Sequence, residues 1–230
     1  MRFKLYLVEN EKLEITDIDI NKIRKDCSIF INWQKAQEKL LPIYRGKNGL
    51  PNAINKLTRR KNRIPMNTRP KVNRILDDLL NKKFHWKPRS SGVFTSGKIN
   101  TVSGYGAPNL FFPIGNYRYV WNTKEEDLFI NDIMGEINFK HTISSGFKEY
   151  KSGMSKTDIN WAYKGARDKV TELLKGLVVD CIDYDLDKAI QSGHEIMFDC
   201  DKYYLVSHTQ AHFSFRELDQ LPKLFTRIIG

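Results

Sequence analysis

The fold is decided by residues 89–121, RSSGVFTSGKINTVSGYGAPNLFFPIGNYRYVW, where short strand-like runs alternate with glycine and hydroxyl-bearing residues. Residues 92–97 (GVFTSG) predict a short strand with a glycine at each end and two hydroxyls, Thr95 and Ser96, at its exit. A bound polar ligand could meet these hydroxyls. The stretch therefore predicts one wall of a ligand pocket.

Two more strands are predicted in the same stretch, over residues 110–114 and 117–121. Gly115-Asn116 separates them and is a strong short turn signal. The simplest interpretation of three such strands is an ordinary antiparallel meander, which by itself carries no function.

Composition places the chain among proteins that attract anions. The 230 residues carry a formal net charge of +11, which draws a protein toward nucleic acid, ribosomes or a phosphate-bearing ligand. Residues 56–71 (KLTRRKNRIPMNTRPK) concentrate much of this charge, and their prolines and lack of apolar periodicity predict an exposed loop. A merely solvated basic loop is the competing interpretation.

The cysteines and the apolar pattern bear on location. Cys27, Cys181 and Cys200 are odd in number and widely spaced, which favours a reducing cytoplasm over secretion and makes none of them a metal ligand or nucleophile candidate. No stretch approaches the roughly 18 apolar residues of a spanning helix, so we expect no membrane partner.

The remaining elements follow the periodicity of apolar residues. The pattern predicts helices over residues 17–40, 68–80, 123–133, 155–177, 185–191 and 215–229. It predicts strands over residues 3–8, 43–46, 178–182, 195–198 and 202–206, the last two paired across Cys200-Asp201. We therefore expect an α+β protein in which residues 1–40 form an N-terminal strand and helical extension and residues 41–230 form the main domain, as one compact unit.

Metal chemistry has little support. His208 and His212 are four residues apart and could share a helix face, but no cysteine or carboxylate ligand set accompanies them. The carboxylate groups Asp77-Asp78, Glu125-Glu126 and Asp180-Asp183-Asp185 are explained by helix-surface or capping roles. No metal cofactor is predicted.

Three short motifs, far apart in the sequence, carry the candidate site residues. In chain order they are Arg45 at the end of a predicted strand, Thr95-Ser96 at the end of another, and Glu195 at the start of a late strand. In order and rough spacing they resemble the Arg-Ser-Glu class of ADP-ribosyltransferases. RSSGVFTSG, a following YG and LFFPIGNYRYVW resemble, more specifically, a group of tailed-phage proteins with an ADP-ribosyltransferase-like core. The resemblance covers residues 41–206 and implies two small packed antiparallel sheets with flanking helices.

The resemblance implies a role for each matching residue. Glu195 would be the catalytic carboxylate that holds the ribose 2′-hydroxyl of NAD and stabilises the oxocarbenium-like transition state. Arg45, beside Gly46, would bind the NAD phosphates or the adenosine ribose through its guanidinium fork. Thr95 and Ser96 would position the nicotinamide ribose, with the choice between the two hydroxyls left open. Tyr105 or Tyr119 could stack on nicotinamide.

One departure from the family pattern concerns the acceptor. The arginine-modifying branch has a second glutamate or glutamine two residues before the catalytic one, and this chain has Gly193 there. An arginine acceptor is therefore disfavoured, whereas protein, nucleic acid or water remain open.

The expected function is that of a phage-encoded, NAD-dependent mono-ADP-ribosyltransferase acting on a host or phage macromolecule in the bacterial cytoplasm. The alternative is a basic nucleic-acid-binding or virion structural protein on an inactive version of the same core. Residues that could contact an acceptor or nucleic acid are Arg59, Arg60, Lys61, Arg63 and Arg69. The sequence is silent on the oligomeric state.

Overall fold

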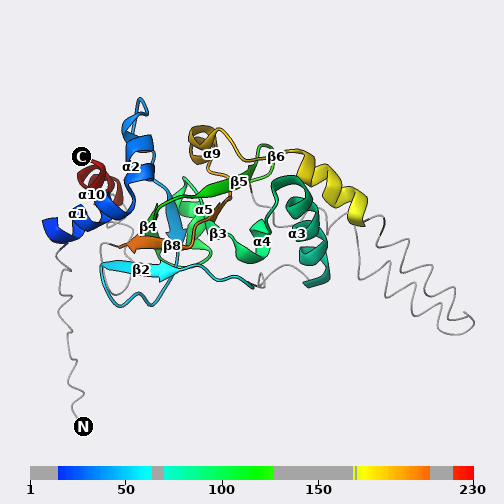
Figure 1. Ribbon diagram of the computed structural model, residues 1–230, viewed down its shortest axis with the longest axis horizontal. Coiled ribbons are helices and arrows are strands. Elements are labelled where there is room, and N and C mark those ends of the chain that lie inside the picture. Colours follow the sequence, from blue (N-terminus) through cyan, green and yellow to red (C-terminus); the bar gives the residue numbers. More distant parts are fainter. Residues whose placement is uncertain (1–14, 64–69, 127–167, 169, 208–219) are drawn as a thin grey trace, which may run out of the picture.

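The computed structural model describes residues 15–63, 70–126, 168, 170–207 and 220–230, which form an α+β fold with two four-stranded antiparallel sheets (Figure 1). The strands are β1 (Tyr44–Gly46), β2 (Ile54–Thr58), β3 (Val93–Thr95), β4 (Pro108–Pro113), β5 (Arg118–Asn122), β6 (Cys181–Ile182), β7 (Ile196–Asp199) and β8 (Lys202–Val206). The helices are α1 (Asp17–Asp26), α2 (Ser28–Lys35), α3 (Pro70–Phe84), α4 (Pro88–Ser91), α5 (Ile99–Ser103), α9 (Leu186–Ser192), α10 (Gln220–Ile229) and a helix over residues 170–179. The coarse fold class predicted from the sequence is confirmed.

The three strands of the stretch 89–121 do not form the meander. The first sheet has the order β1-β4-β8-β2 and the second the order β3-β7-β5-β6, so β4 lies in one sheet and β3 and β5 in the other. The chain at Gly115 crosses between the sheets with φ +66, and the Gly115 N–H donates to the Asp26 carbonyl at 3.1 Å. The prediction of a hairpin turn there is wrong, because a tertiary contact replaces the cross-strand hydrogen bonds.

The predicted pairing of the two late strands is also wrong. β7 pairs with β3 and β5, whereas β8 pairs with β2 and β4 in the other sheet. Cys200 and Asp201 thus carry the chain from the second sheet to the first. Each late strand gains two buried neighbours in this way, more than a two-stranded hairpin would provide.

The N-terminal helix predicted over residues 17–40 is two helices, with a break at Cys27. α1 begins with a capping box, in which Thr16 accepts from the Asp19 N–H at 3.2 Å while the Asp19 carboxylate accepts from the Thr16 N–H. Cys27 leaves helical geometry at φ −108° and ψ 25°. The break allows Ile23 of α1 and Phe30 of α2 to be buried in the same core.

The basic segment at residues 56–71 is partly a strand. β2 extends to Thr58 and pairs along its whole length with β8, so the prediction of a loop is wrong for residues 56–58. Residues 56–58 form a strand because of a tertiary contact: β8 supplies an edge with which even a lysine-containing strand can pair.

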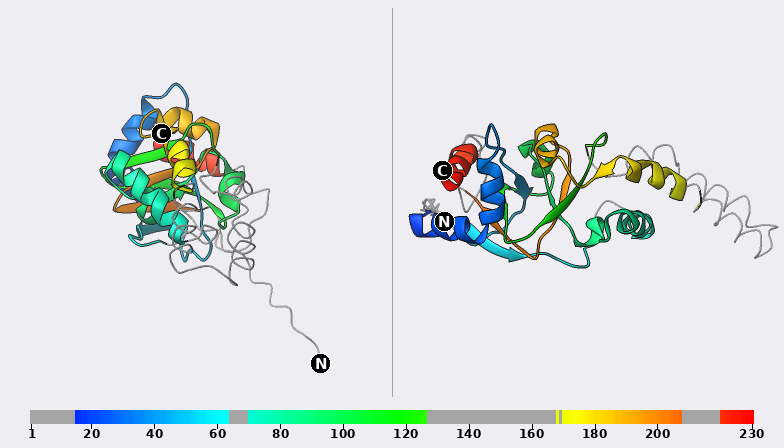
Figure 2. Two further views of the ribbon diagram at one scale, coloured as in Figure 1. Left: turned by 90° about the vertical axis from the view of Figure 1, so that its right-hand side faces the viewer. Right: turned by 45° about the horizontal axis from the view of Figure 1, so that its top comes forward.

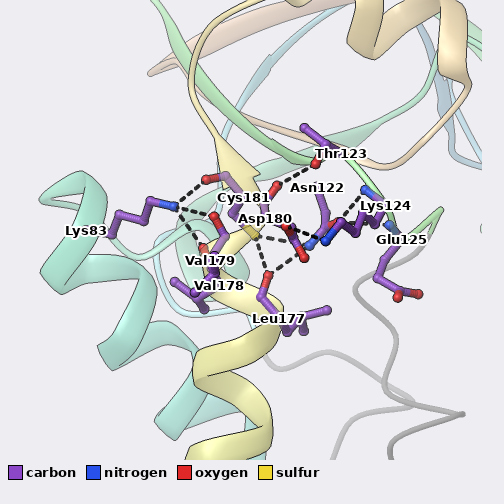
Figure 3. A network of polar contacts seen from close by, with 10 residues as sticks. All are labelled: Lys83, Asn122, Thr123, Lys124, Glu125, Leu177, Val178, Val179, Asp180 and Cys181. Atoms are coloured by element: carbon purple, nitrogen blue, oxygen red, sulfur yellow. Dashed lines mark hydrogen bonds and ion pairs between the residues drawn. The ribbon is translucent and has the colours of Figure 1, made fainter.

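The strand predicted at residues 178–182 is shorter than expected, because Val178 and Val179 belong to the helix over residues 170–179. Figure 3 shows the reason at the end of this helix, where Lys83 Nζ donates to the carbonyls of Val178, Val179 and Cys181 at 3.0, 2.9 and 2.7 Å. A cation there satisfies carbonyls that have no partner within the helix.

The same figure shows that residues 123–126 start no helix. Asn122 Oδ1 accepts from the backbone N–H groups of Lys124 and Glu125, each at 2.8 Å (Figure 3). The local structure is therefore a turn held by an asparagine side chain, and the prediction of a helix beginning at Thr123 is wrong for its first residues.

Several predicted elements match the structure closely. The amphipathic helix α3, the short helix α9 ended by Gly193, and α10 all lie where the apolar pattern predicts them. Other expectations lie outside the described residues: strand 3–8, the caps Asn67 and Thr68, residues 127–133, most of helix 155–177, residues 215–219, His208 and His212.

Two hydrophobic clusters hold the fold together. The larger one joins both sheets to α1, α2, α9 and α10, with α1, α2 and α10 at one end of the molecule in Figure 1. The smaller one lies at the other end, where α3 and helix 170–179 cover the second sheet with Leu76, Leu80 and Leu174 (Figure 2). Because α1 and α2 share the larger cluster with the strands, they pack as part of the main core, and the boundary at residue 40 stays a prediction.

The cysteines are buried and free, which fits inert thiols. Burial raises the pKa of Cys181 to about 11 and that of Cys200 to about 12, and it also raises the pKa of Cys27. Such thiols stay protonated and unreactive near neutral pH. Within the described residues, no helix combines the length and apolar character that membrane crossing requires.

Candidate functional site

The candidate site is a cavity of about 510 Å³ at the junction of the two sheets, called here the junction cavity. Its lining residues are Arg45, Gly46, Lys47, Asn48, Leu57, Thr58, Arg60, Arg63, Gly92, Val93, Phe94, Thr95, Thr101, Val102, Tyr105, Glu195 and Tyr203. The sheets meet at a single bridge, in which the Tyr44 N–H donates to the Ser96 carbonyl at 2.8 Å and the Ser96 N–H to the Tyr44 carbonyl at 3.0 Å. A volume of this size suits a small-molecule or cofactor ligand.

Arg45 reaches the junction cavity from β1, one residue after the bridge. Its Nη1 donates to the Phe94 carbonyl at 2.8 Å, and its guanidinium lies 5.7 Å from the centre of the Tyr203 ring. Gly46 is required by close approach, because a Cβ at this position would stand 2.0 Å from the Val102 carbonyl oxygen. The two predicted neighbours therefore have different roles, Arg45 toward the cavity and Gly46 toward α5.

The two hydroxyls at the exit of β3 differ in position. Thr95 lines the junction cavity and donates from Oγ1 to the Ile196 carbonyl at 3.1 Å. Ser96 is fully buried behind the wall and donates from Oγ to the Gly193 carbonyl at 2.7 Å. Of the two, Thr95 is the one placed to meet a ligand.

Glu195 enters the junction cavity from the residue before β7. It is 5% exposed, and its backbone N–H donates to the Glu126 carbonyl at 2.8 Å. Because Thr95 pairs with Ile196 in the sheet, Glu195 and the end of β3 are held next to each other. The order Arg45, Thr95, Glu195 read from the sequence thus converges on one cavity.

Arg89 is a partner of this carboxylate that sequence reasoning missed. Arg89 Nη1 lies 3.3 Å from Glu195 Oε2, and both side chains are almost completely buried. A buried carboxylate beside a guanidinium is electrostatically compensated, whereas either group alone would be costly. No spacing signal in the sequence joins residues 106 positions apart, so only the fold reveals the pair.

The basic residues predicted to contact an acceptor or nucleic acid fall into three groups by their position relative to the junction cavity. Arg60 and Arg63 line the junction cavity. Arg59 pairs with Asp199 and, at 3.6 Å, with Asp201, and Lys61 is exposed. Arg69 lies outside the described residues.

The two tyrosines predicted to stack on a ligand also differ in position. Tyr105 lines the junction cavity and is 41% exposed, which leaves its ring accessible at the rim. Tyr119 packs against Phe198 with ring centres 5.8 Å apart and does not belong to the lining. Tyr203 of β8 takes the place in the cavity wall that sequence reasoning gave to Tyr119.

The position two residues before Glu195 has a structural reason to be glycine. Gly193 ends α9 with φ +75, a conformation that L side chains rarely adopt. Its carbonyl accepts from the hydroxyls of Ser96 and Thr101 at 2.7 and 3.2 Å. The backbone at Gly193 therefore fixes the entry to Glu195.

The electrostatics of the junction cavity favour an anionic ligand. Four cationic side chains (Arg45, Lys47, Arg60 and Arg63) and one carboxylate (Glu195) line it. Buried Nε of Arg45 and Nη1 of Arg63 have no hydrogen-bond partner among the described residues. Burial lowers the pKa of Arg45, and burial together with the charge of Arg45 lowers the pKa of Arg63. Buried N–H groups of a guanidinium that lack an acceptor are stabilised when an anion accepts their hydrogen bonds.

Among the described residues, no group of three or more His, Cys, Asp or Glu side chains could hold a metal ion. Asp77, one of the carboxylates noted in the sequence, accepts backbone hydrogen bonds from Arg89 and Ser90 at 2.8 and 3.0 Å.

Comparisons with protein-family models, with curated proteins and with solved structures give no match to this chain. The junction cavity thus combines a buried carboxylate, hydroxyls, exposed and half-buried arginines and tyrosines around one space that favours an anion.

Proposed function

We propose that this protein is an NAD-dependent mono-ADP-ribosyltransferase that transfers ADP-ribose to a macromolecule and releases nicotinamide. The observation that carries the proposal is the convergence of Arg45, Thr95 and Glu195, far apart in the sequence, on one cavity of about 510 Å³. A core of the ADP-ribosyltransferase type, with NAD as the cosubstrate and no metal, is part of this proposal.

The proposed reaction requires a carboxylate that is shielded from solvent. In the reaction, the bond between nicotinamide and C1′ of the ribose breaks, nicotinamide leaves, and a nucleophile of the acceptor bonds to C1′ and loses its proton. Positive charge builds on the ribose in the transition state, as in glycoside hydrolysis. Glu195, 5% exposed, stabilises this charge most where water cannot screen it.

The cationic wall suits the other half of NAD. A pyrophosphate carries two negative charges, and Arg45 and Arg63 present buried N–H groups without a protein acceptor among the described residues. In this proposal Thr95 positions the nicotinamide ribose and Tyr105 stacks on nicotinamide; the support is that both residues line the junction cavity.

The test uses NAD labelled in the adenosine half, a host lysate, and the full chain as wild type or Glu195→Gln. Wild type is expected to label macromolecules and release nicotinamide, and Glu195→Gln is expected to lower the rate at least about 10²-fold because the charged ribose loses its carboxylate. Glu172→Gln is the matched control, since Glu172 is an exposed residue of helix 170–179 paired with Lys175 at 2.6 Å. Equal labelling by wild type and Glu195→Gln would refute the role of Glu195.

The second candidate function, a nucleic-acid-binding protein on the same core, is favoured by Arg60 at the cavity and the exposed Lys61 next to it. It predicts binding to mixed-sequence DNA or RNA that weakens steeply between low and moderate salt. NAD would then neither be consumed nor raise the melting temperature, whereas a true NAD site stabilises the fold by an amount that grows with the logarithm of the NAD concentration above Kd. Labelled nucleic acid in the transferase assay would instead identify the acceptor.

A further inference from the structure

We propose that Arg89 is a positioning residue for Glu195, which holds the carboxylate in its reactive orientation from behind the junction cavity. The proposal rests on the proposed transferase function and gives a role to Arg89, which opens the RSSGVFTSG stretch but received no role from the sequence. Arg89 is not itself among the residues that line the cavity. It acts on the reaction through Glu195.

The contact itself is close and shielded. Arg89 Nη1 lies 3.3 Å from Glu195 Oε2, and the two side chains are 3% and 6% exposed. A guanidinium N–H donates along a direction fixed by the planar group, so it restricts the position of the carboxylate oxygen more than a flexible ammonium does. An ionised carboxylate has about four acceptor positions, so the contact at Oε2 is compatible with a hydrogen bond from a ligand hydroxyl.

The backbone that carries Arg89 is anchored by a second carboxylate. Asp77 of α3 is buried and accepts the backbone N–H groups of Arg89 and Ser90 at 2.8 and 3.0 Å. These two N–H groups belong to α4, a single turn that could not hold its place by its own hydrogen bonds. Asp77 therefore fixes α4, and α4 fixes Arg89.

The side chain of Arg89 is held by an aromatic ring as well. Its guanidinium lies 5.2 Å from the centre of the Phe94 ring, and the Arg63 guanidinium lies 3.9 Å from the same centre. Phe94 belongs to β3 and lines the junction cavity. α3, α4 and β3 thus combine to place one cation against one carboxylate, an arrangement that pre-organises a reactive group.

The experiment compares full-length wild type with Arg89→Lys, Arg89→Met and Asp77→Asn. NAD-glycohydrolase or transferase rates give kcat and KM, and a crystal structure of each variant gives the Glu195 conformation. We expect Arg89→Met to lower kcat about 10²-fold with KM changed less than threefold, and Arg89→Lys to recover about tenfold of the loss. Asp77→Asn, which leaves both Arg89 and Glu195 intact, is expected to lower kcat about tenfold by releasing α4.

Arg118→Met is the matched control. Arg118 also pairs with a carboxylate, Asp199 at 2.7 Å, and also packs on an aromatic ring, Trp86, but it lies outside the cavity lining. Its kcat is expected to stay within twofold of wild type. Thermal melting of every variant identifies any that is unfolded at the assay temperature, and if Arg89→Met is, Arg89→Lys and Asp77→Asn carry the test.

The outcomes separate the two proposals. If wild type consumes NAD and the Arg89 and Asp77 variants keep the wild-type kcat, the positioning role is refuted while the proposed function stands. If wild type does not consume NAD but Glu195 changes rotamer in the Arg89 variants, the proposed function fails and the positioning of Glu195 by Arg89 stands. An unchanged Glu195 conformation in folded Arg89→Met refutes the positioning role in either case.

Discussion

Gly193 shows how a single residue fixes the backbone beside the candidate carboxylate. Its φ is +75, and its carbonyl accepts hydrogen bonds from the hydroxyls of Ser96 and Thr101. Gly193 therefore sets the path of the chain from α9 to Glu195, and a side chain at this position conflicts with the backbone conformation.

Gly193→Glu is expected to lower the free energy of unfolding by about 1–2 kcal/mol, because a side chain at this φ adopts the left-handed conformation against its steric preference. A Cβ at this position would also stand 2.3 Å from Lys98 Cγ, so the lysine side chain must move. Urea unfolding of both proteins checks the expectation.

Gly104→Ala is the control for Gly193→Glu. Gly104 ends α5 with φ −63°, and nothing lies within 4 Å of a Cβ built there. Alanine at such a position leaves stability unchanged or raises it by about 0.4–1 kcal/mol. If Gly193→Glu is as stable as Gly104→Ala, the proposed strain at Gly193 does not exist.

At the scale of elements, the end of helix 170–179 depends on a residue of another helix. Lys83, near the end of α3, donates to three carbonyls at residues 178, 179 and 181 (Figure 3). The Lys83 side chain thus caps the C-terminal end of helix 170–179 just before β6, and it links α3 to the second sheet. This explains why Val178 and Val179, which have the composition of a strand, are helical.

Lys83→Met is expected to lower the free energy of unfolding by about 1–2 kcal/mol, since three carbonyls lose a charged donor while the apolar stem is kept. Lys82→Met, the neighbouring exposed lysine of α3, is the control and should change stability by less than about 0.5 kcal/mol. Chemical unfolding followed by circular dichroism measures both. Similar values for the two variants would contradict the capping role.

At the scale of the whole molecule, Asp26 connects the N-terminal helices to the first sheet. Its Oδ2 accepts from Lys56 of β2 at 2.9 Å and from Tyr204 of β8 at 2.7 Å. The hydrogen bond from Lys56 and then that from Tyr204 lower the pKa of Asp26 below its ordinary 3.8. Residues on both sides of position 40 therefore share one polar contact as well as one hydrophobic cluster.

The pKa of Asp26 gives a pH dependence with a definite sign. A carboxyl whose folded pKa lies below its unfolded value stabilises the fold above the unfolded pKa and loses this contribution as pH falls through the folded pKa. Wild type is expected to exceed Asp26→Asn in stability by about 0.5–1 kcal/mol at pH 7, a small value because the pair is partly solvated. The difference should vanish as the pH falls from about 4 toward 2.

Unfolding of wild type and Asp26→Asn by urea at several pH values checks this expectation. Asp19→Asn is unsuitable as a control because Asp19 is part of a capping box, so Asp183→Asn, at an exposed position between β6 and α9, is used. A difference between wild type and Asp26→Asn that stays constant from pH 7 to pH 2 would exclude the linkage.

Local sequence signals were reliable where an element is defined by its own residues. The apolar stripe of α3, the stop at Gly193 and the apolar face of α10 are each complete within a few turns of chain, and each element lies where its pattern predicts it. The order of Arg45, Thr95 and Glu195 also sufficed to select residues that line one cavity. Such signals need no knowledge of distant partners.

Tertiary structure alone decided which strands are neighbours and which charges meet. Gly115-Asn116 has the composition of a hairpin turn, yet it links different sheets, because β4 before it pairs with β8 and β5 after it pairs with β7. Arg89 and Glu195 are 106 positions apart, and no local pattern can signal their contact. The sequence by itself determined helices such as α3, α9 and α10, the hydroxyl-bearing wall and the candidate carboxylate, whereas the burial that gives this carboxylate a guanidinium partner exists only once both sheets have packed.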